Sequence, residues 1–231
     1  MKIAYDKFKL GLAKNNASFF KHDIIFNNEL VRLRPLKVED RSTFAQFPAD
    51  YAVWKYFAIK MRQAQDMNEY IDDAVQQRNL GLRYHFAIED QKTGKIVGST
   101  AFGNYSPKDS RIEIGWSWVE TLFQGSGINK NAKFSLLNFA FDYLNMERVE
   151  FKTDVLNVRA RAALIKIGAT EEGVLRSHTL MPDDRRRDTV YYSILKDEWD
   201  TEIRLKTFSD YSSDVQILMG SCDSICNNDN D

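Results

Sequence analysis

An alternating apolar pattern over residues 111–119 predicts a β-strand. Every second residue forms its apolar face: Ile112, Ile114, Trp116 and Trp118. The opposite face would carry Glu113, Gly115 and Ser117. After a short glycine-rich stretch, apolar residues recur at every fourth position from Ile128 to Leu144, which predicts an amphipathic helix with a wide apolar face. The pattern is therefore strand, glycine-rich turn and helix.

The same reasoning predicts the elements that precede this unit. Residues 30–35 form a strand that ends at Pro35, residues 38–47 a short helix that stops before Pro48, and residues 65–79 a helix with Gly81 at its C-terminal end. We expect strands over residues 84–89 and 95–102, separated by a turn. Together with the strand over residues 111–119 they should form an antiparallel meander.

The chain after the long helix alternates between strands and one more helix. Residues 148–155 predict a strand, and Asn157 can cap a helix that runs to Gly168. Two further strands, over residues 174–180 and 189–195, predict a hairpin. These elements indicate the α+β class, with a sheet flanked by helices.

Composition limits the domain organisation and the partners. The chain has 231 residues, 43% of them hydrophobic, and a net charge of -1, so it suits one domain with extensions and carries no large basic footprint for nucleic acid. We expect an N-terminal extension over residues 1–29, a domain over 30–204 and an acidic, disordered tail over 205–231. No apolar run is long enough to span a membrane, and no secretory leader is visible, which predicts a cytoplasmic protein. The two cysteines, Cys222 and Cys226, are too few for a structural zinc site, and no metal is expected.

The glycine-rich stretch Gln124-Gly-Ser-Gly-Ile-Asn129 is the candidate binding motif. Backbone N–H groups at the start of a helix lack intrahelical partners and carry partial positive charge, so such a turn can hold a phosphate or pyrophosphate. Two known motifs are excluded, because Gly127 is not followed by Lys-Ser/Thr and the third glycine of the dinucleotide fingerprint is replaced by Lys130. A tight connection without a ligand is the alternative.

Taken together, these motifs resemble the GNAT superfamily of acetyl-CoA-dependent N-acetyltransferases, and within it the Rim-type branch that acetylates the N-termini of ribosomal proteins. The resemblance covers about residues 30–200. It rests on six stretches of the chain: Leu33-Arg-Pro35, Ile112-Glu-Ile-Gly115, the loop 124–129, Phe151-Lys-Thr-Asp154 with Asn157, Ile167-Gly168 and Asp188-Thr-Val-Tyr-Tyr-Ser-Ile-Leu195. It implies a mixed, mostly antiparallel sheet of about seven strands, splayed between the fourth strand (111–119) and the fifth (148–155).

The resemblance also implies where acetyl-CoA, as co-substrate, would bind. Its pyrophosphate would lie on the loop formed by Gln124, Gly125, Ser126, Gly127, Ile128 and Asn129. Its pantetheine arm would run between the two splayed strands and pair with the backbone near Trp118 and Val119. Asn157 matches a residue that contacts the cofactor in many relatives, or it is a plain N-cap. Leu122 departs from the family pattern, which places Gln or Arg there.

For catalysis, the resemblance implies direct transfer of an acetyl group to a neutral primary amine. Glu113 is the candidate general base, because a carboxylate can take the amine's proton through water. An ion-paired strand glutamate is the alternative. Many relatives carry Ser or Tyr near the departing sulfur, but Ala160 and Leu164 occupy those positions here, so the general acid stays unassigned. Tyr191 and Tyr192 are its candidates, whereas His85 and His178 are interpreted as structural or surface residues.

The acceptor side is less defined in sequence. Trp54, Tyr56 and Phe57 are candidates for shaping its pocket, and residues 185–187, three arginines, could attract an acidic partner. The acceptor is expected to be a protein or peptide N-terminus or a small amine, and the protein a monomer or homodimer. Two other hypotheses stay open: a non-catalytic acyl-CoA-binding sensor, and an interaction module whose glycine-rich loop is only a turn.

Overall fold

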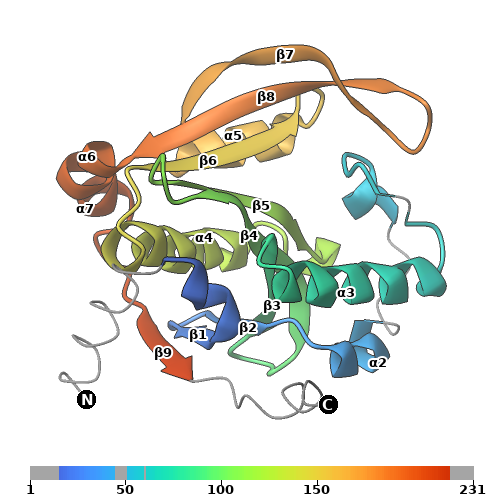
Figure 1. The fold of residues 1–231 in the computed structure, drawn as a ribbon, viewed down its shortest axis with the longest axis horizontal. Coiled ribbons are helices and arrows are strands. Elements are labelled where there is room, and N and C mark those ends of the chain that lie inside the picture. Colours follow the sequence, from blue (N-terminus) through green and yellow to red (C-terminus); the bar gives the residue numbers. More distant parts are fainter. Residues whose placement is uncertain (1–15, 45–50, 60, 219–231) are drawn as a thin grey trace, which may run out of the picture.

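A mixed sheet lies at the centre of the computed structural model, which describes residues 16–44, 51–59 and 61–218 (Figure 1). Within these residues the sheet has nine strands in the order β7-β8-β6-β5-β4-β3-β2-β1-β9. Only the β5–β6 pair is parallel. The strands are β1 (Asp23–Asn27), β2 (Val31–Pro35), β3 (Arg83–Asp90), β4 (Ile96–Ser106), β5 (Arg111–Val119), β6 (Arg148–Asp154), β7 (Thr170–Leu180), β8 (Arg186–Leu195) and β9 (Asp214–Leu218).

Helices cover both faces of this sheet. The longer ones are α3 (Ala64–Asn79), α4 (Ile128–Asn138), which continues into the π-helical turn η5 (Phe139–Tyr143), and α5 (Val158–Lys166). The shorter ones are η1 (Asn16–Lys21), η2 (Val38–Asp40), α2 (Arg41–Phe44), η3 (Tyr51–Trp54), η4 (Thr121–Phe123), α6 (Lys196–Glu198), η6 (Trp199–Ile203) and α7 (Arg204–Thr207). Neighbouring residues of β3 separate the two faces: Phe86 packs in the core with α4, and Ala87 packs in a second core with α3.

The predicted meander is confirmed. Strands β3, β4 and β5 pair antiparallel in sequence order. Helix α3 ends beside Gly81, whose φ of +69° is the left-handed conformation that commonly follows a helix. Asn157 caps α5 as predicted, because its side-chain oxygen accepts the N–H of Ala160. The α+β class is therefore correct, with two more strands than the expected seven.

Both extra strands lie in segments that the sequence analysis placed outside the domain. Strand β1 pairs with β2, and β9 pairs with β1 from Asp23–Leu218 to Asn27–Asp214. Phe26 on β1 is fully buried, and Val215 and Ile217 on β9 pack against the same core. The sheet therefore extends beyond both predicted boundaries of the domain, at residues 30 and 204. Polar residues surround these two short strands, so composition did not reveal them.

Some expectations concern residues that the structure does not describe. Cys222 and Cys226, the tail beyond residue 218, residues 1–15 and the predicted helix end at Pro48 all lie outside the described residues. In the part that is described, no helix is both long and apolar enough to cross a membrane.

Candidate active site

Strand β5 contains a bulge at Trp116. The backbone of Trp116 has a φ of +49°, and the pairing of β5 with β4 shifts register between Ser99 and Ala101. An extra residue on one strand disrupts the alternation of side chains at that point. Side chains that would share one face of a regular strand therefore point to opposite faces of the sheet before and after the bulge.

This reversal corrects one prediction. Before the bulge, Ile112 and Ile114 lie in the core with α4. After it, Trp118 lies in the core with α3, and the ring of Trp116 stacks on the guanidinium of Arg83 at 4.1 Å. The four apolar residues of the strand therefore do not share one face. The alternating pattern predicted that they would, because it assumes a regular strand and cannot reveal a bulge.

Strands β5 and β6 diverge, which confirms the expected splay. They pair only over residues 111–113 and 148–150. Beyond these residues a cavity of about 350 Å³ opens, lined by β5, β6, α4 and α5 and by residues 56–59. The long β7–β8 hairpin extends across the molecule toward the 51–59 segment and contributes to the lining at that end (Figure 1). The cavity thus runs from the start of α4 to the hairpin.

The glycine-rich loop borders this cavity. Gly125 and Gly127 have φ values of +81° and +91°, a backbone that L residues rarely adopt, and the place of a Cβ on Gly125 is open space. The N–H groups of Asn129 and Lys130 have no acceptor within the described parts of the chain. Asn129 also lines the cavity. The loop therefore fits a pyrophosphate, which would take these N–H groups at the positive end of the helix.

Side chains of the loop mainly support the loop itself. Ser126 Oγ donates to the Phe123 carbonyl at 2.6 Å, and Gln124 Nε2 donates to the Val119 carbonyl at 2.9 Å. Ile128 is buried in the core. A ligand on this loop would thus meet mainly backbone groups, as the sequence analysis expected.

The backbone of Val119, rather than that of Trp118, faces the gap between the splayed strands. The N–H of Glu120 donates to the Val97 carbonyl on β4 at 2.8 Å. Because successive residues of a strand direct their backbone groups to opposite neighbours, Trp118 faces β4 and Val119 faces the gap. Gln124 uses the Val119 carbonyl, which leaves the Val119 N–H for a ligand. Of the two residues predicted for this backbone contact, the structure therefore favours Val119 over Trp118.

The α5 wall of the cavity is mostly apolar. Ala160 and Leu164, at the positions where relatives carry Ser or Tyr, both line the cavity. Asn157 lines it as well, although its side-chain oxygen already caps the helix at 3.1 Å from the Ala160 nitrogen. Neither Ala160 nor Leu164 can give a proton to a departing sulfur.

Glu113 lies in the inner wall of the cavity and is 5% exposed. Its Oε2 accepts hydrogen bonds from Lys152 Nζ and Asn104 Nδ2, both at 2.6 Å. Its Oε1 faces Gly115, where an ideal Cβ would stand only 3.1 Å away. Glycine at 115 therefore leaves room for the carboxylate, with one oxygen held by two donors and the other left for a substrate.

The partner of Glu113 remains charged at neutral pH. Burial lowers the pKa of Lys152, but the hydrogen bond and the charge of Glu113 outweigh it, so this pKa is raised. Lys152 also lies over the ring of Tyr191 at 4.9 Å. The predicted alternative for Glu113, an ion-paired strand glutamate, is thus also present, and the two roles are compatible.

A cation without a carboxylate partner faces the far end of the cavity. Arg187 Nε donates to Thr189 Oγ1 at 3.1 Å and Nη1 to the Tyr56 carbonyl at 3.4 Å. Among the described residues no carboxylate pairs with it, because Asp154 pairs with Arg185 at 2.6 Å. Burial lowers the pKa of Arg187, although nearby acidic groups oppose the shift. An anionic ligand would relieve this uncompensated charge.

The other aromatic candidates divide between cavity and core. Tyr56 and Phe57 line the cavity, whereas Trp54 packs against Trp118 with ring centroids 4.9 Å apart. Tyr191 and Tyr192 are absent from the cavity lining, and the Tyr192 hydroxyl donates to Glu171 at 2.6 Å. Neither tyrosine is therefore placed to act as the general acid.

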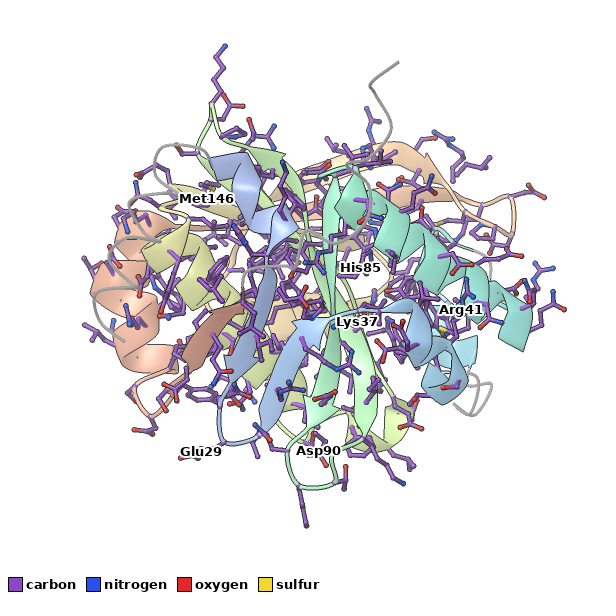
Figure 2. All side chains as sticks on the ribbon, turned by 60° about the horizontal axis from the view of Figure 1, so that its bottom comes forward. Glu29, Lys37, Arg41, His85, Asp90 and Met146 are labelled. Atoms are coloured by element: carbon purple, nitrogen blue, oxygen red, sulfur yellow. The ribbon has the colours of Figure 1, made fainter. Side chains whose placement is uncertain are left out.

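The two histidines considered in the sequence have different environments. His85 is buried in the middle of the molecule (Figure 2), 3.1 Å from the Tyr70 hydroxyl, and burial lowers its pKa to about 3. His178 lies at the cavity rim, 3.1 Å from Thr189 Oγ1. Nowhere in the described segments do three or more His, Cys, Asp or Glu residues gather as metal ligands.

Lys133 is a cavity residue that the sequence analysis did not identify. It extends from α4 into the cavity, is 5% exposed, and donates hydrogen bonds to Ser117 Oγ at 2.5 Å and Thr100 Oγ1 at 3.4 Å. Burial lowers its pKa to about 7, although the charge of Glu113 opposes the shift. A signal existed in sequence, because Lys133 lies one helical turn before Leu137, on the apolar face of the predicted helix.

Comparisons with known proteins agree with this fold. The family model described as an acetyltransferase (GNAT) domain matches residues 31–170. YdaF of Bacillus subtilis, which carries a provisional name as a ribosomal N-acetyltransferase, is 31% identical over 76% of this chain and 96% of its own. A GCN5-related N-acetyltransferase from Brucella melitensis has a TM-score of 0.71 at 25% identity, over 76% of this chain and 80% of its own. RimJ of Mycobacterium smegmatis, solved in complex with CoA-disulfide, shares the fold at 20% identity, with a TM-score of 0.69 over 84% of this chain and 98% of its own.

Proposed function

Since this chain belongs to the GNAT acetyltransferase family, we propose that it transfers an acetyl group from acetyl-CoA directly to a primary amine. One observation carries the proposal: the open glycine-rich loop at the start of α4 leads into a cavity whose inner wall holds Glu113. A loop that suits a phosphate and a buried carboxylate thus border the same cavity between splayed strands.

The residues present fit acetyl-CoA. The N–H groups of Asn129 and Lys130 and the open space at Gly125 suit the pyrophosphate, and the N–H of Val119 suits an amide of the pantetheine arm. Acetyl-CoA supplies the activated acetyl thioester. The apolar wall of α5 helps to exclude water, which would otherwise compete with the amine.

In this proposal Glu113 acts on the acceptor amine. A primary amine is mostly protonated at neutral pH and must lose a proton before it can attack. Glu113 Oε1 can take that proton directly or through one water, while Lys152 and Asn104 hold the carboxylate in position through Oε2. Held in this way, the carboxylate does not need to reorganise during the reaction.

A non-catalytic acyl-CoA sensor is the second candidate, and the apolar residues Ala160 and Leu164 favour it. The two functions differ in turnover and share cofactor binding. A protein that binds acetyl-CoA and releases no free thiol with any amine or N-terminal peptide would support the sensor.

The binding step is tested by calorimetric titration with acetyl-CoA. We expect the wild-type chain to bind, and Gly125→Val to weaken binding about tenfold or more, because the new side chain fills the space for the pyrophosphate. Gly94→Val is the matched control: Gly94 also has a positive φ, +68°, and open space around it, and it lies on a β-turn outside the cavity. Equal affinity of the two folded variants would contradict the binding site, and a folded wild-type chain that does not bind would favour the interaction module.

Arg187 indicates which amines to test first. The name of YdaF suggests protein N-termini, and the unpaired guanidinium favours acceptors that carry a carboxylate or phosphate near the amine. We expect Arg187→Met to raise KM for such an acceptor about tenfold to a hundredfold, the effect of losing one charged hydrogen bond. KM for the matched neutral amide should change little.

The control for this variant is Arg186→Met. Arg186 is the neighbouring residue on β8, but it is exposed, donates to Ser177 and does not line the cavity. Steady-state kinetics with both acceptors would show whether Arg187 recognises charge. The same rise in KM for the charged and the neutral acceptor would refute that role.

A further inference from the structure

Lys133 is a buried cation that the proposed mechanism leaves unused. It is 5% exposed, and no described carboxylate lies within ion-pair distance of its Nζ. Its partners are two neutral hydroxyls, Ser117 and Thr100, and the ring of Phe151 at 5.9 Å. Burying a charge without a counter-ion is costly, and side chains without a role at such a site are normally apolar.

Among the described residues, the acidic group that attracts Lys133 is already paired with another cation. From β5, Glu113 exerts an attraction, but its Oε2 is already paired with Lys152 on β6. β4 contributes Thr100, and the facing wall of α5 contributes Ala160, Ala163 and Leu164. Lys133 is therefore placed to stabilise negative charge that develops inside the cavity.

The other polar side chains that line the cavity near α4 and α5 either already use their hydrogen atoms in hydrogen bonds or cannot release a proton near neutral pH. Ser117 Oγ accepts from Lys133 and donates to the Gly115 carbonyl at 3.1 Å. Asn157 and Asn129 are amides and cannot release a proton. By contrast, burial brings the pKa of Lys133 to about 7, which suits a group that must give and regain a proton near neutral pH.

We propose that Lys133 is the general acid of the acetyl transfer: its ammonium gives a proton to the sulfur that leaves the acetyl group. This assignment rests on the proposed function. As the amine nitrogen forms its bond to the acetyl carbon, the carbon–sulfur bond breaks and its electron pair stays on sulfur. Lys133 Nζ–H protonates that sulfur to the thiol and becomes a neutral amine, while Glu113 accepts the proton that the attacking amine loses. Solvent returns a proton to Lys133 and removes one from Glu113, so the products are the amide and free CoA.

The first test observes bound CoA without turnover. The ultraviolet absorbance of a thiolate reports the ionisation of the CoA thiol as pH is raised. We expect the thiolate absorbance of CoA bound to the wild-type chain to appear about 1 to 3 pH units lower than with Lys133→Met, because a thiolate and a protonated Lys133 stabilise each other as an ion pair. Methionine is one atom shorter than lysine and apolar, so it fills most of the space of the side chain and removes the ammonium group with its hydrogen bonds to Ser117 and Thr100.

The second test uses kinetics and a matched control. With acetyl-CoA, Lys133→Met should lower kcat about a hundredfold, within the usual range for a general acid. With an acetyl thioester of an acidic aryl thiol, whose thiolate leaves without a proton, the two proteins should be nearly equal in kcat/KM. Lys196→Met is the control, because Lys196 is also partly buried but donates to the Phe141 carbonyl outside the cavity.

Three outcomes would overturn the assignment: unchanged thiol ionisation in folded Lys133→Met, unchanged kcat with acetyl-CoA, or a loss of kcat/KM that is equal with both thioesters. Acetylation of Lys133 itself, seen by peptide mass spectrometry after incubation with acetyl-CoA, would also overturn it by making this amine a nucleophile. Failure of the proposed function looks different, because the wild-type chain would then acetylate no amine. If the wild-type chain is active and Lys133→Met is equally active, only this inference fails.

Discussion

Replacing Glu113 by glutamine is expected to lower kcat by about two to four orders of magnitude while the affinity for acetyl-CoA stays about the same. Glutamine has almost the same shape but cannot accept the proton of the amine. Glu113 lies at the inner wall of the cavity, away from the glycine-rich loop, so cofactor binding should not depend on its charge. Steady-state kinetics and calorimetric titration of the same preparation measure the two quantities.

Glu150→Gln is the matched control for this change. Glu150 pairs with Glu113 in the ladder between β5 and β6, is also buried and also has basic partners, Arg111 and Arg148. It does not line the cavity. Its replacement should leave kcat near the wild-type value, although it will cost some stability because two arginines lose a partner. Equal turnover of Glu113→Gln and the wild-type chain would exclude Glu113 as the base.

Replacing Gly98 by alanine is expected to destabilise the fold by about 3 kcal/mol or more, at or above the upper end of the usual range for overpacking. A Cβ on Gly98 would stand 2.2 Å from the carbonyl oxygen of Trp118 and 3.0 Å from Cα of Val119. Both are backbone atoms of β5, so no side-chain rotation can relieve the clash. Strand β5 would have to move away from β4 at the wall of the cavity, and acetyl-CoA affinity should fall as well.

Gly103→Ala provides the comparison, and chemical denaturation measures both variants. Gly103 also lies on β4, and a Cβ there would meet the ring of Trp116 at 2.5 Å. Because a side chain can turn where a backbone cannot, the loss of stability should be smaller than for Gly98→Ala. Similar losses of unfolding free energy for the two variants would contradict the view that the β4–β5 backbone contact at Gly98 leaves no room for a Cβ atom.

Local patterns predicted the elements whose residues interact within one segment. The helix from Ile128, the cap at Asn157 and the left-handed residue at Gly81 all follow from spacing and backbone preference over a few residues. These three predictions are confirmed because the interactions that produce them are also local. The glycine-rich turn follows from the same kind of pattern, and its role in binding stays a prediction.

Predictions that depended on register were less complete. The bulge at Trp116 places Trp118 in the opposite core from Ile114, which alternation alone cannot show. Strand β9 became visible only through its pairing with β1, because the polar residues around it resemble a tail. Whether such a segment forms a strand depends on whether the sheet has an unpaired edge strand beside it, and the length and polarity of the segment do not show this.

The sequence by itself determined a strand, a glycine-rich turn and a helix in the order that the family uses, and with them the candidate loop and the candidate base. Only the tertiary structure decided what Glu113 meets, since Lys152 and Asn104 reach it from β6 and β4, and only folding buried Lys133 beside Ser117. The physical reason is that periodicity specifies which side of one element is apolar. The charge and pKa of a side chain depend on groups that other elements bring within a few ångströms of it.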